Sequence, residues 1–122
     1  MIEMRLSQSG PIHILIITEL RQLIISGILT EGAKLPSIRE LAVHLGINPN
    51  TIQRAYRELK AEGYLYALLG KGWFVSRKQD MGIMGDKRRD SLLTTFDETT
   101  RELQYLGLDK QSLLQRLDSI KV

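Results

Sequence analysis

The sequence predicts a mostly helical α+β protein with a compact first domain over residues 1–77 and a helical tail over residues 78–122. Three observations support this fold class. Apolar residues recur at helical spacing through most of the chain, and glycines or capping residues mark the ends of these segments. Only the stretch from Tyr64 to Ser76 changes to the aromatic and branched composition of strands.

Composition narrows the possible function classes. The 122 residues are 43% hydrophobic and 25% charged, as expected for a folded globular chain. The absence of cysteine excludes disulfides, thiolate metal sites and cysteine nucleophiles. No secretory leader pattern or apolar run of roughly 18 residues is present, so we expect a cytoplasmic protein without a membrane span.

The net charge of +3 is unevenly distributed. Residues 1–78 carry ten Lys and Arg against six Asp and Glu, whereas residues 79–122 carry seven against eight. This distribution suits a first domain that meets a polyanion and a tail with another task.

A first helix is predicted from Pro11 to Gly27. At about 100° per residue, one apolar stripe comprises Ile12, Ile16, Leu20 and Leu23. Ile14 and Ile25 point nearly the opposite way. Because this helix is apolar on two sides, we expect it to pack against its own domain and against either the tail or a second subunit.

Two further helices follow around a glycine. "AKLP" is predicted to be extended because Leu35 precedes a proline. Ser37 and Glu40 fit the capping box of a short helix, "IRELAVHL", that ends at Gly46. Asn48 caps a third helix, which has Pro49 in its first position and stops at Gly63. This is a helix-turn-helix.

The next segment predicts a two-stranded hairpin. "YLYALL" and "WFVS" flank "GKG", whose glycines supply the positive φ angles of a tight loop. We expect Trp73, Leu68 and Leu69 to be buried against the first helix or a partner. The hairpin makes the first domain a winged helix.

The tail is predicted to be a linker and a helical hairpin. "SRKQDMGIMGD" is polar and glycine-bearing and indicates a linker. A helix follows from Asp86 to Leu106, and Asp109 caps a last helix. The tail's apolar stripes contain Leu92, Leu93, Phe96, Leu103, Leu106, Leu113, Leu114, Leu117 and Ile120. Two short helices cannot bury these stripes alone, and dimerisation would cover them.

The third helix has two faces. With Ile52 as the reference direction, the apolar face also contains Ala55, Tyr56 and Leu59. The opposite, polar face contains Asn50, Gln53, Arg54 and Arg57. Asn and Gln can bond twice with adenine, and Arg can bond twice with guanine, in a DNA major groove. A polar face is also common on surface helices, but the hairpin that follows favours DNA contact.

The segment "LPSIRELAVHLGINPNTIQRAYRELKAEG", followed by "GKGWFV", resembles the N-terminal DNA-binding domain of GntR-type bacterial transcription regulators. The resemblance covers residues 11–75. The two-helix tail further resembles the YtrA-like branch, whose members lack a large effector-binding domain and dimerise through that tail. The resemblance implies a cytoplasmic homodimer, usually a repressor, that binds a pseudopalindromic double-stranded DNA operator.

The resemblance also implies roles for individual residues. Arg39 corresponds to an operator-contacting arginine at the start of the second helix. The recognition segment contains Asn48, Asn50, Thr51, Gln53 and Arg54, and the tip of the wing contains Gly70, Lys71 and Gly72. Arg57 joins them as a member of the polar face. The wing, "ALLGKGW", is less polar than the family's usual "TRRGKGT", and should bind phosphate less strongly.

Two alternatives stay open from the sequence. The apolar wing also suits a winged helix that contacts protein or RNA without operator specificity. A small-molecule effector could act through a pocket, although a tail of about 40 residues offers little volume for one. His13 and His44 lie in different helices without acidic partners at ligand spacing, and no catalytic motif is present. We therefore expect no metal, no cofactor and no enzymatic activity.

Overall fold

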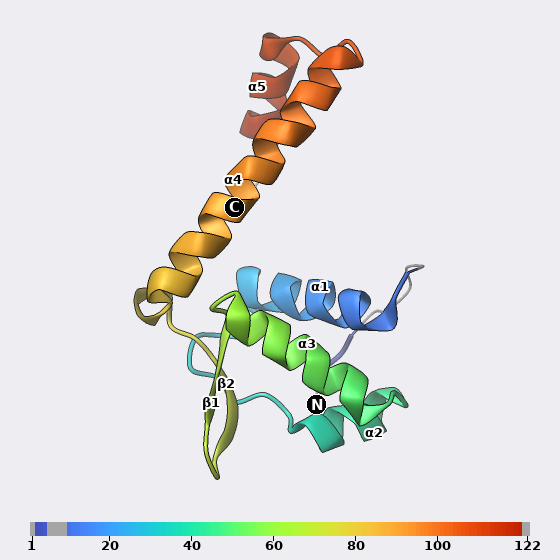
Figure 1. The fold of residues 1–122 in the computed structure, drawn as a ribbon, viewed down its shortest axis with the longest axis vertical. Coiled ribbons are helices and arrows are strands. Elements are labelled where there is room, and N and C mark those ends of the chain that lie inside the picture. The colour runs from blue at the N-terminus through green and yellow to red at the C-terminus, as the bar shows by residue number, and fades with distance from the viewer. Residues whose placement is uncertain (1, 5–9, 121–122) are drawn as a thin grey trace. The chain divides into compact units, whose positions relative to one another are not determined.

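The computed structural model describes residues 2–4 and 10–120, and its chain contacts divide into two compact units, Met1–Arg88 and Arg89–Val122. The elements in chain order are α1 (Ile12–Ile25), α2 (Ile38–Leu45), α3 (Pro49–Ala61), β1 (Leu65–Leu68), β2 (Gly72–Val75), the 3-10 turn η1 (Lys78–Asp80), α4 (Gly82–Tyr105) and α5 (Lys110–Ser119) (Figure 1). The predicted α+β winged-helix class is confirmed.

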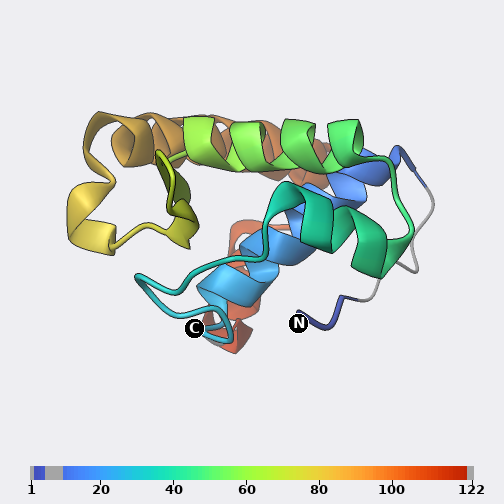
Figure 2. The same cartoon turned by 90° about the horizontal axis from the view of Figure 1, so that it is seen from below.

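The core of the first unit lies between α1, α2 and α3. Figure 2 shows α3 beside both of the other helices. Thirteen side chains form this core, and all are hydrophobic or aromatic: Ile16, Ile17, Leu20, Leu23, Leu35, Leu41, Ala42, Ile52, Ala55, Tyr56, Leu59, Leu65 and Val75. The predicted apolar face of α3 is therefore confirmed in full.

Helix α1 buries most of its predicted stripe. Ile16, Leu20 and Leu23 are buried, but Ile12 is 41% exposed, so its place in the buried stripe is wrong. Ile12 is the first residue of α1, where the helix has not yet reached the packed part of the core. Ile14 and Ile25 are exposed, which leaves α1 with a second apolar face, as predicted.

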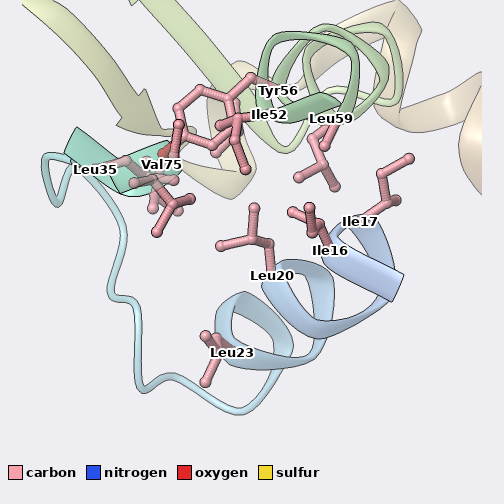
Figure 3. Close-up of a cluster of buried hydrophobic side chains, with 13 residues drawn as sticks. Ile16, Ile17, Leu20, Leu23, Leu35, Ile52, Tyr56, Leu59 and Val75 are labelled. Atoms are coloured by element: carbon pink, nitrogen blue, oxygen red, sulfur yellow. The ribbon is translucent and has the colours of Figure 1, made fainter. Parts of the chain in front are cut away.

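Tyr56 is fully buried in the core, beside Ile52 (Figure 3). Its hydroxyl donates a hydrogen bond of 2.8 Å to the carbonyl oxygen of Pro36. Its ring meets Trp73 edge to face, with the ring centroids 5.3 Å apart. Burial raises the pKa of Tyr56, and the nearby charge of Glu40 adds to this shift. One side chain thus joins α3 to the segment ahead of α2 and to the wing.

The start of α2 is fixed by the predicted capping box. The Ser37 hydroxyl accepts a hydrogen bond from the Glu40 amide, and the Glu40 carboxylate accepts one from the Ser37 amide, each at 3.0 Å. The hydrogen bonds with Ser37, and to a smaller extent the charge of Lys34, hold the pKa of Glu40 below its ordinary value. Gly46 closes the helix in the left-handed conformation.

The wing is a short antiparallel ladder with a third segment beside it. β1 and β2 pair from Leu65 opposite Val75 to Leu68 opposite Gly72. The predicted extended segment ahead of α2 bonds to β2, because the Leu35 amide donates to Trp73 and the Val75 amide donates to Ala33. This anchoring ties the base of the wing to the helix-turn-helix.

The connection to the tail differs from the predicted linker. Instead of a polar coil up to residue 86, the chain forms η1 and enters α4 at Gly82. Gly82 and Gly85 lower the helix propensity of this segment. Met81, however, packs against Gly63 and Gly85, and these contacts outweigh the low propensity. α4 and α5 otherwise form the predicted hairpin, with Asp109 capping α5. None of the described helices is long and apolar enough to cross a membrane.

We expect Tyr56→Phe to lower the free energy of unfolding by about 1–2 kcal/mol, because the Pro36 carbonyl loses its donor in a partly buried position. Urea unfolding of both proteins at one concentration measures this difference. The control is Tyr105→Phe, at a side chain that is 89% exposed, where we expect a change within about 0.5 kcal/mol. Equal stability of Tyr56→Phe and wild type would contradict the prediction.

The capping box predicts a pH dependence of stability. Because the pKa of Glu40 is lower in the folded chain than its ordinary value of 4.5, its contribution is present above that value and is lost as the pH falls through the folded pKa. Wild type should therefore unfold at a higher temperature than Glu40→Gln at about pH 7, and the gap should close towards about pH 3. A gap of constant size across these pH values would rule out the carboxylate as its source.

Candidate nucleic-acid interface

The outer face of α3 carries four polar side chains that have no partner in the described part of the chain. Asn50, Gln53, Arg54 and Arg57 are all exposed, as the helical period predicts. Over residues 2–4 and 10–120, none of these side chains makes a hydrogen bond or an ion pair. All of their donors and acceptors are therefore available to an outside partner.

Packing behind this face fixes its direction. Ile52, Tyr56 and Leu59 are fully buried on the inner side of the same helix. Rotation of α3 would expose these side chains, and each is worth about 1.5–3 kcal/mol when buried. The polar face is consequently held outward by the core.

The N-terminus of α3 is already satisfied by its own cap. Pro49 has no amide hydrogen, the Asn50 amide donates to Oδ1 of Asn48 at 2.8 Å, and the Thr51 amide donates to the Asn48 carbonyl at 3.0 Å. No acidic residue lies in this first turn. The helix end therefore attracts an anion through its dipole, but these backbone amides are not free to bind one.

The hydrogen bonds of the cap determine which side-chain groups at the start of α3 can bind an outside partner. Oδ1 of Asn48 is occupied, so only the amide nitrogen of this exposed side chain can donate to an outside group. Thr51 is half-buried. Asn50 and Gln53, in contrast, keep both the donor and the acceptor that two bonds with adenine require.

Arg39 projects from the first turn of α2, next to the capping box. Its side chain is exposed and borders a groove lined by Ser37, Glu40, Val43 and His44. Val43 is 79% exposed although it is apolar. The sequence analysis assigned no role to Val43, because the helical period alone does not show which side of so short a helix remains uncovered.

The tip of the wing is a three-residue loop from Leu69 to Lys71, stabilised by a hydrogen bond from the Lys71 amide to the Leu68 carbonyl. Gly70 and Gly72 have φ angles of +76° and +114°, which side chains rarely adopt. Lys71 is exposed, and Gly72 is half-buried. The two glycines thus allow the turn that presents the lysine.

The apolar residues of the wing have two different environments. Trp73 packs on Tyr56 of α3, so the expectation of packing is confirmed for this residue, although the neighbour is not the first helix. Leu68 is 45% exposed and Leu69 is 104% exposed, so neither is buried by this chain. The tip combines one cation with two uncovered leucines.

Lys34 is a further cation beside the wing that the sequence analysis missed. A Cβ atom at Gly72 would lie only 3.2 Å from Cε of Lys34, so the lysine stem lies against the glycine backbone. Lys34 pairs with Phe74 through an isolated β-bridge. This pairing brings together segments far apart in the sequence, and no local pattern marks it.

The described residues do not form a cluster of three or more metal-ligating side chains. Within the second unit, however, α4 and α5 enclose an apolar groove of about 360 Å³. Its lining includes Leu92, Phe96, Leu103, Leu113 and Leu117. The sequence analysis expected little volume in so short a tail, but the volume of this groove lies within the range of small-molecule sites.

Comparisons with known proteins agree with this geometry. Residues 15–75 match the model of the bacterial regulatory proteins of the gntR family. The HTH-type transcriptional repressor YtrA of Bacillus subtilis is 33% identical over 124 residues, covering 98% of this chain and 92% of the repressor. The transcriptional regulator YhcF of Bacillus subtilis is also 33% identical, over 108 residues, covering 88% of this chain and 87% of that protein. Both relatives are named as transcriptional regulators rather than enzymes.

Two solved structures are similar to this chain, one over nearly its whole length and one over about half of it. A transcriptional antiterminator from Listeria monocytogenes has a TM-score of 0.79 at 31% identity, over 97% of this chain and 87% of that one. The DNA-binding domain of AraR in complex with an operator has a TM-score of 0.53 at 29% identity, over 56% of this chain and 82% of that one. By the family match and by its full-length similarity to YtrA, this chain belongs to the GntR family of bacterial regulatory proteins.

Proposed function

We propose that this protein is a homodimeric repressor that binds a pseudopalindromic operator in double-stranded DNA. The observation that carries the proposal is the outer face of α3, where two amides and two guanidinium groups are exposed and unbonded above a fully buried inner face. The related AraR domain, solved in complex with an operator, supports DNA binding. In a helix-turn-helix the second helix lies in the major groove, and in this chain that helix is α3.

Within this proposal, the side chains divide into base contacts and backbone contacts. Asn50 and Gln53 pair with adenine, and Arg54 pairs with guanine or a phosphate. The DNA backbone is bound by Arg57, Arg39 and the remaining amide nitrogen of Asn48. Thr51 packs at the edge of the DNA major groove. Lys71, presented by Gly70 and Gly72, binds phosphate from the wing, and Lys34 adds a second cation there.

Residues 1–77 would thus bind DNA, and residues 78–122 would form the dimer. No described residue of α4 or α5 is buried in the single chain, although the hairpin carries exposed Leu92, Leu93, Phe96 and Leu117. The apolar groove between the two helices suits side chains from a second copy. The exposed Ile14 and Ile25 of α1 supply a further surface for the same contact.

A twofold dimer would place two copies of α3 in successive major grooves, roughly 34 Å apart. The operator would then contain two inverted half-sites. Binding over a promoter would repress transcription by excluding the polymerase.

A second candidate is a winged helix that contacts RNA or protein without operator specificity. The uncovered Leu68 and Leu69 favour it, because an apolar tip adds little to phosphate binding. The name of the related Listeria antiterminator is compatible with such a role. The groove in the tail likewise has the volume for a small apolar effector, which would compete with the second subunit.

The DNA-binding proposal predicts different effects for α3 and the wing. Against a duplex selected from a randomised pool, we expect Gln53→Ala to weaken binding by about 1–3 kcal/mol and to relax preference at one base pair. Lys71→Ala should weaken binding to all sequences alike. It should also reduce the slope of log affinity against log salt concentration by about one, because one fewer ion is released on binding. Fluorescence titrations at two salt concentrations measure both effects. Binding without sequence preference in wild type would favour the second candidate.

The dimer proposal predicts that Phe96→Asp gives a monomer, because the variant would place a charge in the apolar groove. Light scattering coupled to size exclusion measures the mass. Leu69→Asp is the matched control: it adds the same charge at a more exposed leucine of the wing and should leave the dimer intact. A monomeric wild type, or a dimeric Phe96→Asp, would contradict the proposal.

A further inference from the structure

The C-terminal end of α3 is joined to α1 and to the first turns of α4 by three charged side chains. Arg21 of α1 donates to both carboxylate oxygens of Glu62, at 2.8 and 2.9 Å. Arg88 of α4 lies 3.7 Å from Oε2 of the same carboxylate. All three residues belong to the first unit, so this cluster is internal to it.

The stability of α3 does not explain why a glutamate occupies position 62. Glu62 is the C-cap of α3, where the negative end of the helix dipole disfavours a carboxylate. Two arginines from other helices compensate for it. Nε of Arg88 is buried without a hydrogen-bond partner among the described residues, so this arginine is not an ordinary solvated surface residue.

A close backbone contact lies next to these charges. A Cβ atom at Gly63 would lie 3.2 Å from the backbone nitrogen of Gly85 and 3.3 Å from Cβ of Met84. A Cβ atom at Gly85 would lie 2.8 Å from Cβ of Met81. The turn that ends α3 and the first turn of α4 therefore touch through two glycines, at a distance that larger residues would not allow.

We propose that this joint, composed of Arg21, Glu62, Gly63, Gly85 and Arg88, makes the protein selective for the spacing between operator half-sites. The joint couples the C-terminal end of α3 to α4, and α4 continues without a break to Tyr105. The inference rests on the proposed function, in which α3 reads DNA and the tail dimerises. Glu62 is then a positioning residue, because it acts through α3 and contacts no base.

The test measures spacing preference separately from base recognition. A panel of duplexes carries the two selected half-sites at the preferred spacing and at one and two base pairs more or less, together with a duplex that has a single half-site. Affinities of full-length wild type, Glu62→Gln and Gly85→Ala are measured on the whole panel. Glu58→Gln is the matched control, because Glu58 is one turn earlier on α3 and exposed.

Coupling between two binding sites typically changes affinity by roughly 5–150-fold. We expect Glu62→Gln to reduce the preference for the best spacing by about fivefold or more, with single half-site affinity and dimer mass unchanged. Glu58→Gln should keep the wild-type profile. Gly85→Ala should flatten the profile in the same way, because its new Cβ forces Met81 and the first turn of α4 to move.

The outcomes separate the two levels of the proposal. A wild-type protein that prefers one spacing, with both variants folded and equally selective, would overturn the role of the joint alone. A wild-type protein that binds every spacing alike would overturn the operator model and the joint together. A loss of single half-site affinity in Glu62→Gln that equals the loss on the full operator would show a merely structural role.

Discussion

The burial of Tyr56 is the interaction on which the rest of the first unit depends. Its ring is fully buried and packs in a T-shaped contact with Trp73 of the wing, and its hydroxyl donates a hydrogen bond to the Pro36 carbonyl ahead of α2. The segment ahead of α2 and the wing are thus both held at α3 by a single side chain. A buried hydroxyl needs a partner, and the carbonyl that supplies it lies just before the capping box. This satisfied polar group inside an apolar core therefore helps to fix the relative positions of α2, α3 and the wing.

This arrangement explains why the polar face of α3 can remain unbonded. Side chains with free donors and acceptors gain nothing from the fold, so their direction must be set by the residues behind them. Arg21 shows the contrast, because Nε and Nη2 of its guanidinium donate to the carboxylate of Glu62. Arg54 and Arg57 are of the same chemical type but have no partner among the described residues. The chain thus uses arginine both for internal structure and for an outward surface.

Local signals predicted most of the fold from the sequence. Ser37, Asn48 and Gly46 act through neighbours a few residues away, and the helices begin and end where these residues place them. The early start of α4 was not predictable in this way, because it depends on a contact between Gly63 and Gly85. Composition alone indicated a linker there.

The candidate site likewise contains features that local patterns predict and features that depend on contacts between distant segments. The outward face of α3 follows from helical period, which is a local property. Lys34 was missed because its place beside Gly72 comes from pairing between distant segments. The full exposure of Leu69 also escaped prediction, since hydrophobic residues are usually covered and the sequence does not show that the wing extends beyond its core. Tertiary structure therefore determines the features of the site that the sequence pattern could not predict.

The tail differs from the first unit in how its apolar residues are covered. A hairpin of α4 and α5 without a buried residue gains little hydrophobic stabilisation in the single chain, and helices of this kind are marginal in water. Their apolar residues nevertheless recur on facing sides, and this pattern leaves a groove rather than a filled core. Such a surface becomes stable when another apolar surface covers it. In the proposed dimer, folding of the tail and assembly of the two copies are one process, whereas the first unit has a complete core of its own.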